Sequence, residues 1–271
     1  MREKNTNSIN LTYFYVPLLL LVLLASFIAF SPISAHALLK WQVSYKKSLG
    51  LLKSKKYDSA LKEAKKALKE NKNPYTLELN GNILQFLKRF KLSNHYFKKS
   101  LAYAVFNASK KSSSDKRIDK FISMAKNNIG LNYLLIGNYL LKENKTENAL
   151  NSYKKGLAYA NAKRLKNMLM LNSAIGYEKI SKFKLARNYA KKVIVNSPKN
   201  PFAYFIMGRA EYGLNELDLA TENFKSAVGL LPSNKIFKKA LKTAEEKIRA
   251  INKSNKKNVS GIKKNLRNLF K

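Results

Sequence analysis

The sequence predicts an all-α protein, a helical-hairpin repeat solenoid in which pairs of helices stack in a row. Two observations support this. Short amphipathic segments recur along the chain with a period of about 34 residues; Pro198 and Pro232, for example, stand one such period apart. In each segment, a triplet of residues at i, i+4 and i+7 shares one helix face. A period of this length with two helices per unit is typical of a repeat array.

The clearest copy spans residues 201–234. Its second helix carries Ala220, Phe224 and Ala227 on one face, and Pro232 ends it because proline cannot continue a helix. Gly208 stands twelve residues before Ala220, so two helix backbones can approach closely there. Four more triplets repeat this pattern upstream: Ala60, Ala64 and Ala67; Ser93, Phe97 and Ser100; Ala149, Tyr153 and Gly156; Ala186, Ala190 and Val193.

At these residues the chain resembles the tetratricopeptide-repeat family. Gly208, Ala220, Phe224, Ala227 and Pro232 stand where the family has them. Three positions depart from the pattern, since Tyr204 replaces a tryptophan, Met207 a leucine and Glu211 a tyrosine. The resemblance implies a right-handed superhelix of about five repeats whose first helices line a concave groove. We place the array at residues 41–251, with repeats at 41–74, 74–107, 130–163, 167–200 and 201–234 and a capping helix at 235–251.

The segments outside the repeats have their own patterns. Residues 107–115 are a polar loop, and apolar residues at helical spacing over 116–129 predict an extra helix or an extension of the third repeat. Residues 252–271 form a basic tail without an acidic residue, either a frayed end or a small amphipathic helix.

Residues 1–37 predict either a signal peptide or a membrane anchor. The apolar run Leu11–Phe30 is about long enough to span a bilayer. Ala35-His36-Ala37 is a small-x-small cleavage pattern, which predicts export with Leu38 as the mature N-terminus. The protein would then be periplasmic or extracytoplasmic. The lysines after residue 39 favour the alternative, an inner-membrane anchor that holds the repeats in the cytoplasm.

Composition restricts the chemistry. The chain has 53 Lys and Arg against 16 Asp and Glu, a net charge of +37, so polyanions are eligible partners. It has no cysteine, which excludes disulfides and thiolate sites. We find no catalytic, cofactor or metal motif, and a lone helical histidine such as His95 is more often a surface residue. The sequence therefore predicts a non-enzymatic protein without a cofactor.

Two surfaces are candidates for binding. The family resemblance implies a groove for a protein or peptide partner, with large apolar residues near its C-terminal end; its residues are Leu131, Leu134, Asn138, Met168, Leu171, Ile175, Phe202, Phe205 and Arg209. Flanking Arg209 and Lys179 predict a preference for an acidic residue in the partner. The carboxylate clamp known in the family is not expected, because Leu134 and Phe202 stand where it needs basic residues.

The second surface is a row of paired lysines at equivalent places in four second helices, which we call the lysine ladder: Lys65, Lys66, Lys98, Lys99, Lys154, Lys155, Lys191 and Lys192. Solvation alone explains exposed lysines, so the ladder is the weaker candidate. It supports an alternative function, binding to an anionic membrane surface or envelope polymer through the ladder and the basic tail. Nucleic acid is disfavoured as a partner, since Phe97, Tyr153 and Phe224 belong to the packing triplets instead of alternating with the lysines. The favoured function is an exported or membrane-tethered interaction scaffold.

Overall fold

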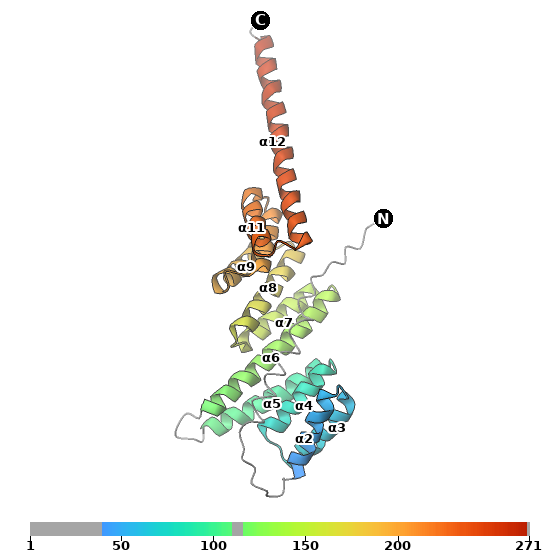
Figure 1. Cartoon of the computed structure of the whole chain (residues 1–271). Helices are drawn as coiled ribbons and strands as arrows, with labels where there is room; N and C mark the ends of the chain where they lie inside the picture. Colours follow the sequence, from blue (N-terminus) through green and yellow to red (C-terminus); the bar gives the residue numbers. More distant parts are fainter. Residues whose placement is uncertain (1–39, 110–115, 270–271) are drawn as a thin grey trace. The chain divides into compact units, whose positions relative to one another are not determined.

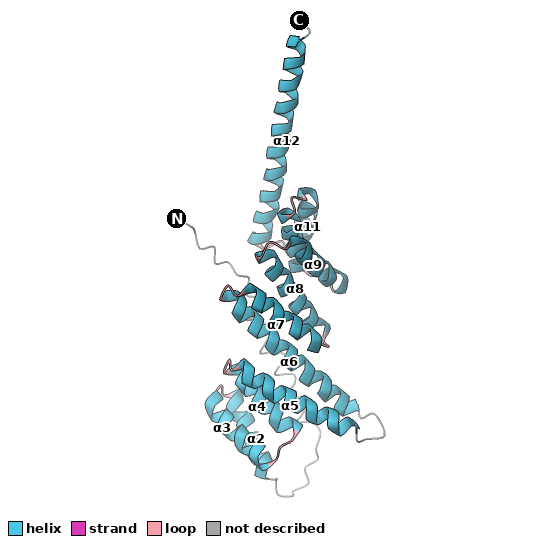
Figure 2. Ribbon diagram, turned by 180° about the vertical axis from the view of Figure 1, so that it is seen from behind, coloured by secondary structure: helices cyan, strands magenta, loops and turns pink. Residues whose placement is uncertain are grey.

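The computed structural model describes residues 40–109 and 116–269, and everything described is helix, turn or loop, with no strand. The all-α prediction is confirmed for this part (Figures 1 and 2). Its eleven helices are α2 (Lys40–Lys53), α3 (Tyr57–Glu70), α4 (Pro74–Phe86), α5 (Phe90–Ser109), α6 (Lys116–Lys142), α7 (Thr146–Tyr159), α8 (Lys163–Lys179), α9 (Phe183–Asn196), α10 (Pro201–Gly213), α11 (Leu217–Leu230) and α12 (Lys235–Leu269). The predicted signal or anchor at 1–37 lies outside the described residues. None of the described helices is long and apolar enough to cross a membrane.

The helices form five hairpins, α2–α3, α4–α5, α6–α7, α8–α9 and α10–α11. Each hairpin contacts the next through its second helix, and the first helix α8 also contacts the first helices α6 and α10 directly. This is the nearest-neighbour stacking of a repeat array, in which each unit buries its apolar face on the following unit.

The turn inside each hairpin has the same backbone geometry. Lys55 and Lys88 have φ values of 59° and 58°, and the later hairpins have the same left-handed conformation at Asn144, Ser181 and Asn215. The next residue donates its amide hydrogen to a carbonyl five residues earlier, as from Lys56 to Leu51 at 2.9 Å. This is a Schellman motif, which satisfies the carbonyls at a helix end. Five equivalent turns confirm the helix–turn–helix unit in each repeat.

Small residues let the two helices of a hairpin cross closely. Ala60, Ala149, Ala186 and Ala220 have no exposed surface. In the first two hairpins a serine takes part in the crossing: the Ser48 hydroxyl donates to the Ala60 carbonyl at 2.8 Å, and Ser93 donates to the Gly81 carbonyl at 2.7 Å. The buried hydroxyls are thus paired with the backbone of the facing helix, which offsets the cost of removing them from water.

Three helices are longer than the repeat pattern alone suggests. α5 continues to Ser109, so the first residues of the loop expected at 107–115 are helical. α6 runs without a break from Lys116 to Lys142, so residues 116–129 extend the third repeat's first helix. α12 runs from Lys235 to Leu269, and the expected boundary at residue 252 falls inside it. None of the three contains a proline, the residue that most strongly ends a helix.

Candidate peptide-binding face

The residues predicted to line the groove lie on the first helices α6, α8 and α10; we call the surface that they form the inner face. Three of them belong to the core. Leu134, Leu171 and Phe205 are 0%, 6% and 2% exposed. The prediction that these three residues line an open groove for a partner is therefore wrong. Leu134 belongs to a buried cluster that includes Tyr153 of its own hairpin and Leu169 of α8, so stacking of the next repeat covers it.

Phe205 is covered by the helix that follows the last hairpin. Phe237 of α12 stacks on Phe205 with ring centroids 4.6 Å apart, and it meets Phe202 edge-on at 5.5 Å. Phe237 itself has no exposed surface. The last hairpin is followed by α12 instead of a further repeat, and α12 supplies the apolar residue that covers α10. This contact accounts for the burial of Phe205 and covers part of Phe202.

Other predicted residues keep part of their surface open. Leu131, Met168, Ile175 and Phe202 are half-buried on α6, α8 and α10. Asn138 is also half-buried, and its amide oxygen accepts a hydrogen bond from the Tyr153 hydroxyl at 2.8 Å. What remains for a ligand is an apolar surface of moderate exposure, without a row of projecting aromatic anchors.

The two cations that were expected to flank a ligand are engaged within the chain. Arg209 forms an ion pair with Glu178 at 2.5 Å, and its guanidinium lies 5.6 Å from the centre of the Phe205 ring. Lys179 donates to the carbonyl of Leu141 at 3.2 Å and to the side-chain oxygen of Asn144 at 2.7 Å. Burial raises the pKa of the Glu178 carboxyl, and the Arg209 guanidinium opposes that shift. Neither cation supports the predicted preference for an acidic partner, because each already has a partner in the protein.

The second hairpin contains a buried carboxyl group. Glu78 of α4 is 8% exposed and accepts a hydrogen bond from the Asn128 side chain of α6. Its second oxygen, Oε2, has no hydrogen-bond partner among the described residues. Burial raises the pKa of Glu78 to about 7, and the neighbouring Asn128 and Ser100 side chains oppose that shift. The repeat pattern does not predict this hydrogen bond, because Asn128 lies in the extension of α6 outside the repeats.

A buried amide network joins the same helices. Gln85 of α4 donates to Asn132 of α6 at 3.0 Å, and Asn132 donates in turn to Asn94 of α5 at 3.0 Å. The three side chains are 7% exposed or less. No local pattern in the sequence predicts this network, because Gln85 and Asn132 are 47 positions apart. Its paired amides hold α6 against the second hairpin.

The lysine ladder is exposed along its whole length. Three of its members nevertheless have neighbours: Lys66 pairs with Glu63 at 3.0 Å, and Lys98 and Lys192 lie 5.9 Å and 5.5 Å from the ring centres of Tyr159 and Tyr189. The ladder is therefore accessible to an anionic partner, but nothing distinguishes it from an ordinary solvated surface.

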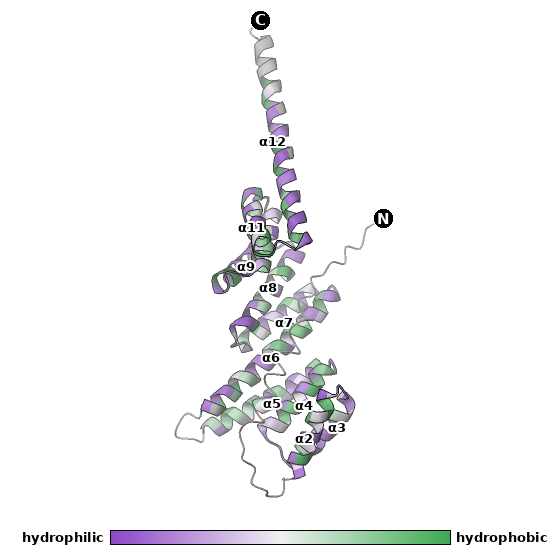
Figure 3. Cartoon of the chain, in the orientation of Figure 1, coloured by the Kyte–Doolittle hydropathy of each residue, from purple (hydrophilic) through white to green (hydrophobic). Residues whose placement is uncertain are grey.

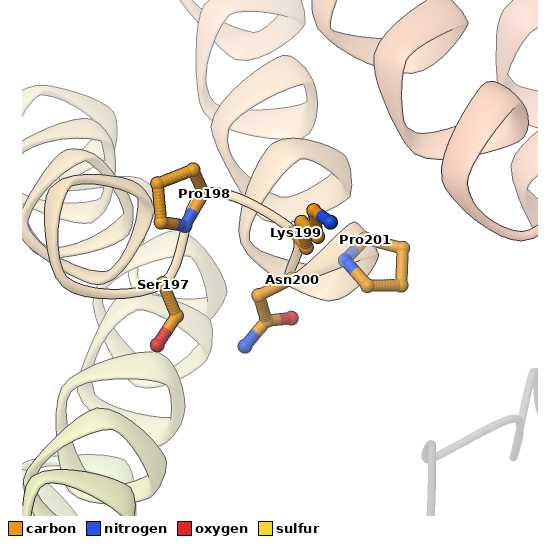
Figure 4. Close-up of a pocket in the computed structure, with 5 residues that line it drawn as sticks. All are labelled: Ser197, Pro198, Lys199, Asn200 and Pro201. Atoms are coloured by element: carbon orange, nitrogen blue, oxygen red, sulfur yellow. The ribbon is translucent and has the colours of Figure 1, made fainter.

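The loop between α9 and α10 forms a shallow hollow lined by Ser197, Pro198, Lys199, Asn200 and Pro201 (Figure 4). The polar side chains of this hollow form hydrogen bonds that stabilise the fold. Asn200 caps α10 by accepting from the amides of Phe202 and Ala203, and Ser197 accepts from Asn167 at 2.7 Å. The hollow is therefore a poor candidate for a ligand site. Over residues 40–109 and 116–269, no group of three or more His, Cys, Asp or Glu side chains is placed to hold a metal.

These features define the chain first as an α-helical repeat-array protein. Within that class, three hairpins place a glycine of the first helix against an aromatic residue sixteen positions later, in the pairs Gly81–Phe97, Gly137–Tyr153 and Gly208–Phe224. Each of the five hairpins also has the left-handed turn at the equivalent residue. With the repeat period and the small-residue triplets, these contacts give the array the fold of tetratricopeptide repeats.

Comparison with known proteins finds no matching family model. A segment of 140 residues is 29% identical to the peptidyl-prolyl cis-trans isomerase FKBP42 of Arabidopsis thaliana, covering 46% of this chain and 38% of that protein. Since the match spans less than two fifths of that relative, the isomerase activity in its name is a property of that protein.

Solved structures similar to this chain include the following three, each with a TM-score below 0.5. The Hsp90 co-chaperone Cns1 of Saccharomyces cerevisiae has a TM-score of 0.49 and 23% identity, covering 51% of this chain and 45% of that chain. MamA has a TM-score of 0.48 and 17% identity, covering 70% of this chain and 91% of that chain. The first tetratricopeptide-repeat domain of human RPAP3 has a TM-score of 0.43 and 22% identity, covering 46% of this chain and 96% of that chain.

Proposed function

We propose that this protein is a non-enzymatic interaction scaffold that binds a peptide or protein segment on its inner face. The observation that carries the proposal is the group of half-buried apolar residues on successive first helices, Leu131 on α6, Met168 and Ile175 on α8, and Phe202 on α10. The array stacks through its triplets without burying these residues fully, and a segment laid in an apolar groove is a recurrent mode of recognition.

The charges of the inner face favour an apolar partner over an acidic one. Arg209 and Lys179 are paired inside the chain, and Leu134 is buried where a clamp would need a lysine. Domains of similar fold have been solved with the HSP90 peptide SRMEEVD and the HSP70 peptide SGPTIEEVD. We expect this chain to bind neither peptide, because the predicted cations of its inner face are already neutralised or hydrogen-bonded.

The test begins with a displayed library of random peptides selected on the full chain. Affinities of the enriched peptides are then compared between an inner-face variant, Met168→Arg with Ile175→Arg, and an outer control, Leu185→Arg with Val195→Arg, whose native residues are 42% and 72% exposed. We expect the inner-face variant to bind at least roughly tenfold more weakly and the control to bind normally. Equal losses in both variants, or binding of SRMEEVD in preference to apolar peptides, would contradict the proposal.

We also propose that residues 1–37 direct the array out of the cytoplasm or tether it to the membrane. The support is the apolar run Leu11–Phe30 followed by the Ala35-His36-Ala37 pattern. Intact-mass analysis of protein from its native cell distinguishes the two forms. A mass that begins at Leu38 supports cleavage and export, whereas the full mass in the membrane fraction supports an anchor. The full mass in the soluble fraction would overturn both.

A second candidate function is binding to an anionic envelope polymer through the lysine ladder. The exposure of all eight lysines favours it. Screening weakens such binding as ionic strength rises, whereas apolar peptide binding responds little to salt. Replacing Lys65, Lys98 and Lys154 with Gln should then reduce retention on a polyanionic resin at low salt. Unchanged retention would rule the ladder out.

A further inference from the structure

The two ends of α12 have different surroundings although they form one continuous helix. Near its start, Phe237 and Ala244 have no exposed surface, and the Lys247 ammonium lies 4.7 Å from the centre of the Tyr212 ring. From Arg249 onward, every side chain that the structure describes is exposed. In both views, α12 continues past its contact with the array (Figures 1 and 2). We call residues 249–269 the distal helix.

The face of α12 that packs on the array continues along the distal helix as an exposed apolar stripe. The packed side has a three- or four-residue spacing, which places its members on one helix face: Phe237, Leu241, Ala244 and Ile248. Ile251, Val259 and Ile262 continue that face and are 40%, 52% and 60% exposed. In the sequence, Leu266 and Leu269 extend the spacing, and Asn255 interrupts it. No described repeat covers the exposed residues of this stripe.

The charge of the distal helix has a single sign. After Glu246 the chain has no acidic residue, and its cations from residue 249 onward are Arg249, Lys253, Lys256, Lys257, Lys263, Lys264, Arg267 and Lys271. Arg249, Lys253 and Lys256 line one flank of the helix with Asn252 and Ser260. Figure 3 shows the described part of this helix as mostly hydrophilic, with isolated hydrophobic residues. The distal helix is thus amphipathic, and its charged groups are all cations.

Charge complementarity decides between the possible occupants. A second copy of the helix would bring cations against cations, and Asn255 would stand within the paired stripe. A nucleic acid would neutralise the cations but would leave the apolar stripe without a partner. An anionic lipid bilayer satisfies both sides, because headgroups pair with lysine and arginine while the acyl boundary takes up the apolar residues.

We propose that the distal helix docks lengthwise on an anionic phospholipid bilayer, with Ile251, Val259 and Ile262 in the acyl boundary and the flanking cations at the headgroups. Docking of this kind holds the repeat array at a membrane surface through its C-terminal helix. The inference does not rest on peptide binding at the inner face. Of the anionic surfaces considered above, it selects a phospholipid bilayer, and it assigns the binding to the distal helix.

A site-specific label tests the geometry. Because the chain has no cysteine, Val259→Cys on the stripe and Ser260→Cys on the basic flank each give a single attachment point for an environment-sensitive fluorophore. With vesicles of phosphatidylcholine and phosphatidylserine, we expect a blue shift at residue 259, little shift at residue 260, and loss of the shift at high salt. The label reports on α12 alone, so attachment of the full chain through residues 11–30 does not produce this signal. Equal signals at the two sites would overturn the proposal.

Matched variants then distinguish vesicle binding by the distal helix from vesicle binding by the lysine ladder. Vesicle titration, followed by the residue 259 label in the full chain, compares two double replacements of lysine by glutamine. The distal variant changes Lys253 and Lys256, and the control changes Lys65 and Lys154 of the ladder. We expect the distal variant to bind roughly thirtyfold more weakly and the control to keep most of its affinity. Equal losses would show that the total charge attracts the protein and that no particular helix docks.

A second pair of variants tests the contribution of the apolar stripe to vesicle binding. Ile251→Ser with Ile262→Ser should weaken vesicle binding, whereas Val195→Ser with Leu219→Ser, at exposed apolar residues of the array, should not. A duplex oligonucleotide is titrated in parallel. If the duplex binds more tightly than the vesicles and the stripe variant leaves it unaffected, the helix is a nucleic-acid site and the lipid proposal is wrong. Peptide binding on the inner face should be unchanged in every α12 variant, so the two proposals can fail separately.

Discussion

The ring of Tyr153 in α7 lies directly against Gly137 in α6, so that a Cβ atom at residue 137 would overlap the ring carbon Cε1. Tyr153 has no exposed surface, and its hydroxyl donates to Asn138, the neighbour of that glycine. Gly81 and Gly208 face phenylalanine rings in the same way, and a Cβ atom at these positions would lie 2.5 Å and 2.8 Å from the nearest ring carbon. The absence of a side chain on one helix therefore makes room for an aromatic ring on the other.

This relationship predicts opposite effects of one substitution at two helical glycines. Gly137→Ala should lower the free energy of unfolding by about 1–3 kcal/mol, because the buried Tyr153 ring cannot move aside freely. Gly50→Ala should raise it by about 0.5–1 kcal/mol, since nothing lies within 4 Å of the added Cβ and alanine is the better helix former. Urea denaturation of both variants measures whether the free energy of unfolding falls or rises. A Gly137→Ala protein that is as stable as the parent, or more stable, would contradict the packing described at Tyr153.

Ala186 provides a test of the helix crossing. It has no exposed surface, so Ala186→Glu would bury an unpaired carboxylate and should cost about 4 kcal/mol or more. The adjacent Leu185 is 42% exposed, and Leu185→Glu should change stability far less. Thermal melting of the two variants makes the comparison. An Ala186→Glu protein that melts like the parent would show that the register of the fourth hairpin is wrong.

The turn between α4 and α5 offers a stabilising change. Lys88 is exposed and has a φ of 58°, a conformation that costs a residue with a Cβ about 1–2 kcal/mol. Lys88→Gly should therefore raise the unfolding free energy by about 1 kcal/mol. Lys62→Gly, at an exposed position inside α3, should lower it by a similar amount. If both variants are destabilised, the left-handed turn at Lys88 is not formed in solution.

Glu78 should make the stability of the array depend on pH. Its pKa is about 7 in the folded chain against 4.5 in the unfolded one, so the folded state binds the proton more tightly. The unfolding free energy should therefore fall as pH rises from 4.5 to about 7, by about 3 kcal/mol from this group. Burial also raises the pKa values of Glu178 and Glu211, which adds to the same trend.

Glu78→Gln should reduce that pH dependence, measured as the denaturation midpoint across the same pH range. Glu63→Gln is a control with the opposite sign, because Lys66 and Lys47 lower the pKa of Glu63. The stability from Glu63 is present above its unfolded pKa and is lost as pH falls through its folded value. An unchanged pH profile in Glu78→Gln would mean that Glu78 is not buried as a neutral acid.

Phe205 distinguishes core from binding surface at the end of the array. Because Phe205 is 2% exposed and stacks on Phe237, Phe205→Ala should cost about 3–5 kcal/mol of stability. Tyr139→Ala, at an aromatic residue 58% exposed, should stay within about 0.5 kcal/mol. Chemical denaturation provides the measurement. A Phe205→Ala variant of normal stability that loses peptide binding would restore Phe205 as an anchor for a partner.

The helical array and its register are predictable from the amino-acid sequence alone. The triplet Ala220, Phe224 and Ala227 lies within two helical turns, and its partner Gly208 is twelve residues upstream. Contacts of this kind are local, since a hairpin brings together residues at a fixed short separation. The period of the pattern therefore predicts them without knowledge of any other repeat.

Which apolar residues stay open depends instead on packing between elements that no local pattern relates. Phe205 and Phe202 occupy the same helix, yet Phe205 is buried and Phe202 is half-buried. Phe205 packs against Phe224 and stacks on Phe237 of α12, whereas Phe202 meets Phe237 only edge-on. The Glu78–Asn128 hydrogen bond joins residues 50 positions apart, where no short spacing predicts a contact. Burial at these positions follows from how a neighbouring helix is placed, and the tertiary contacts of that helix fix its placement.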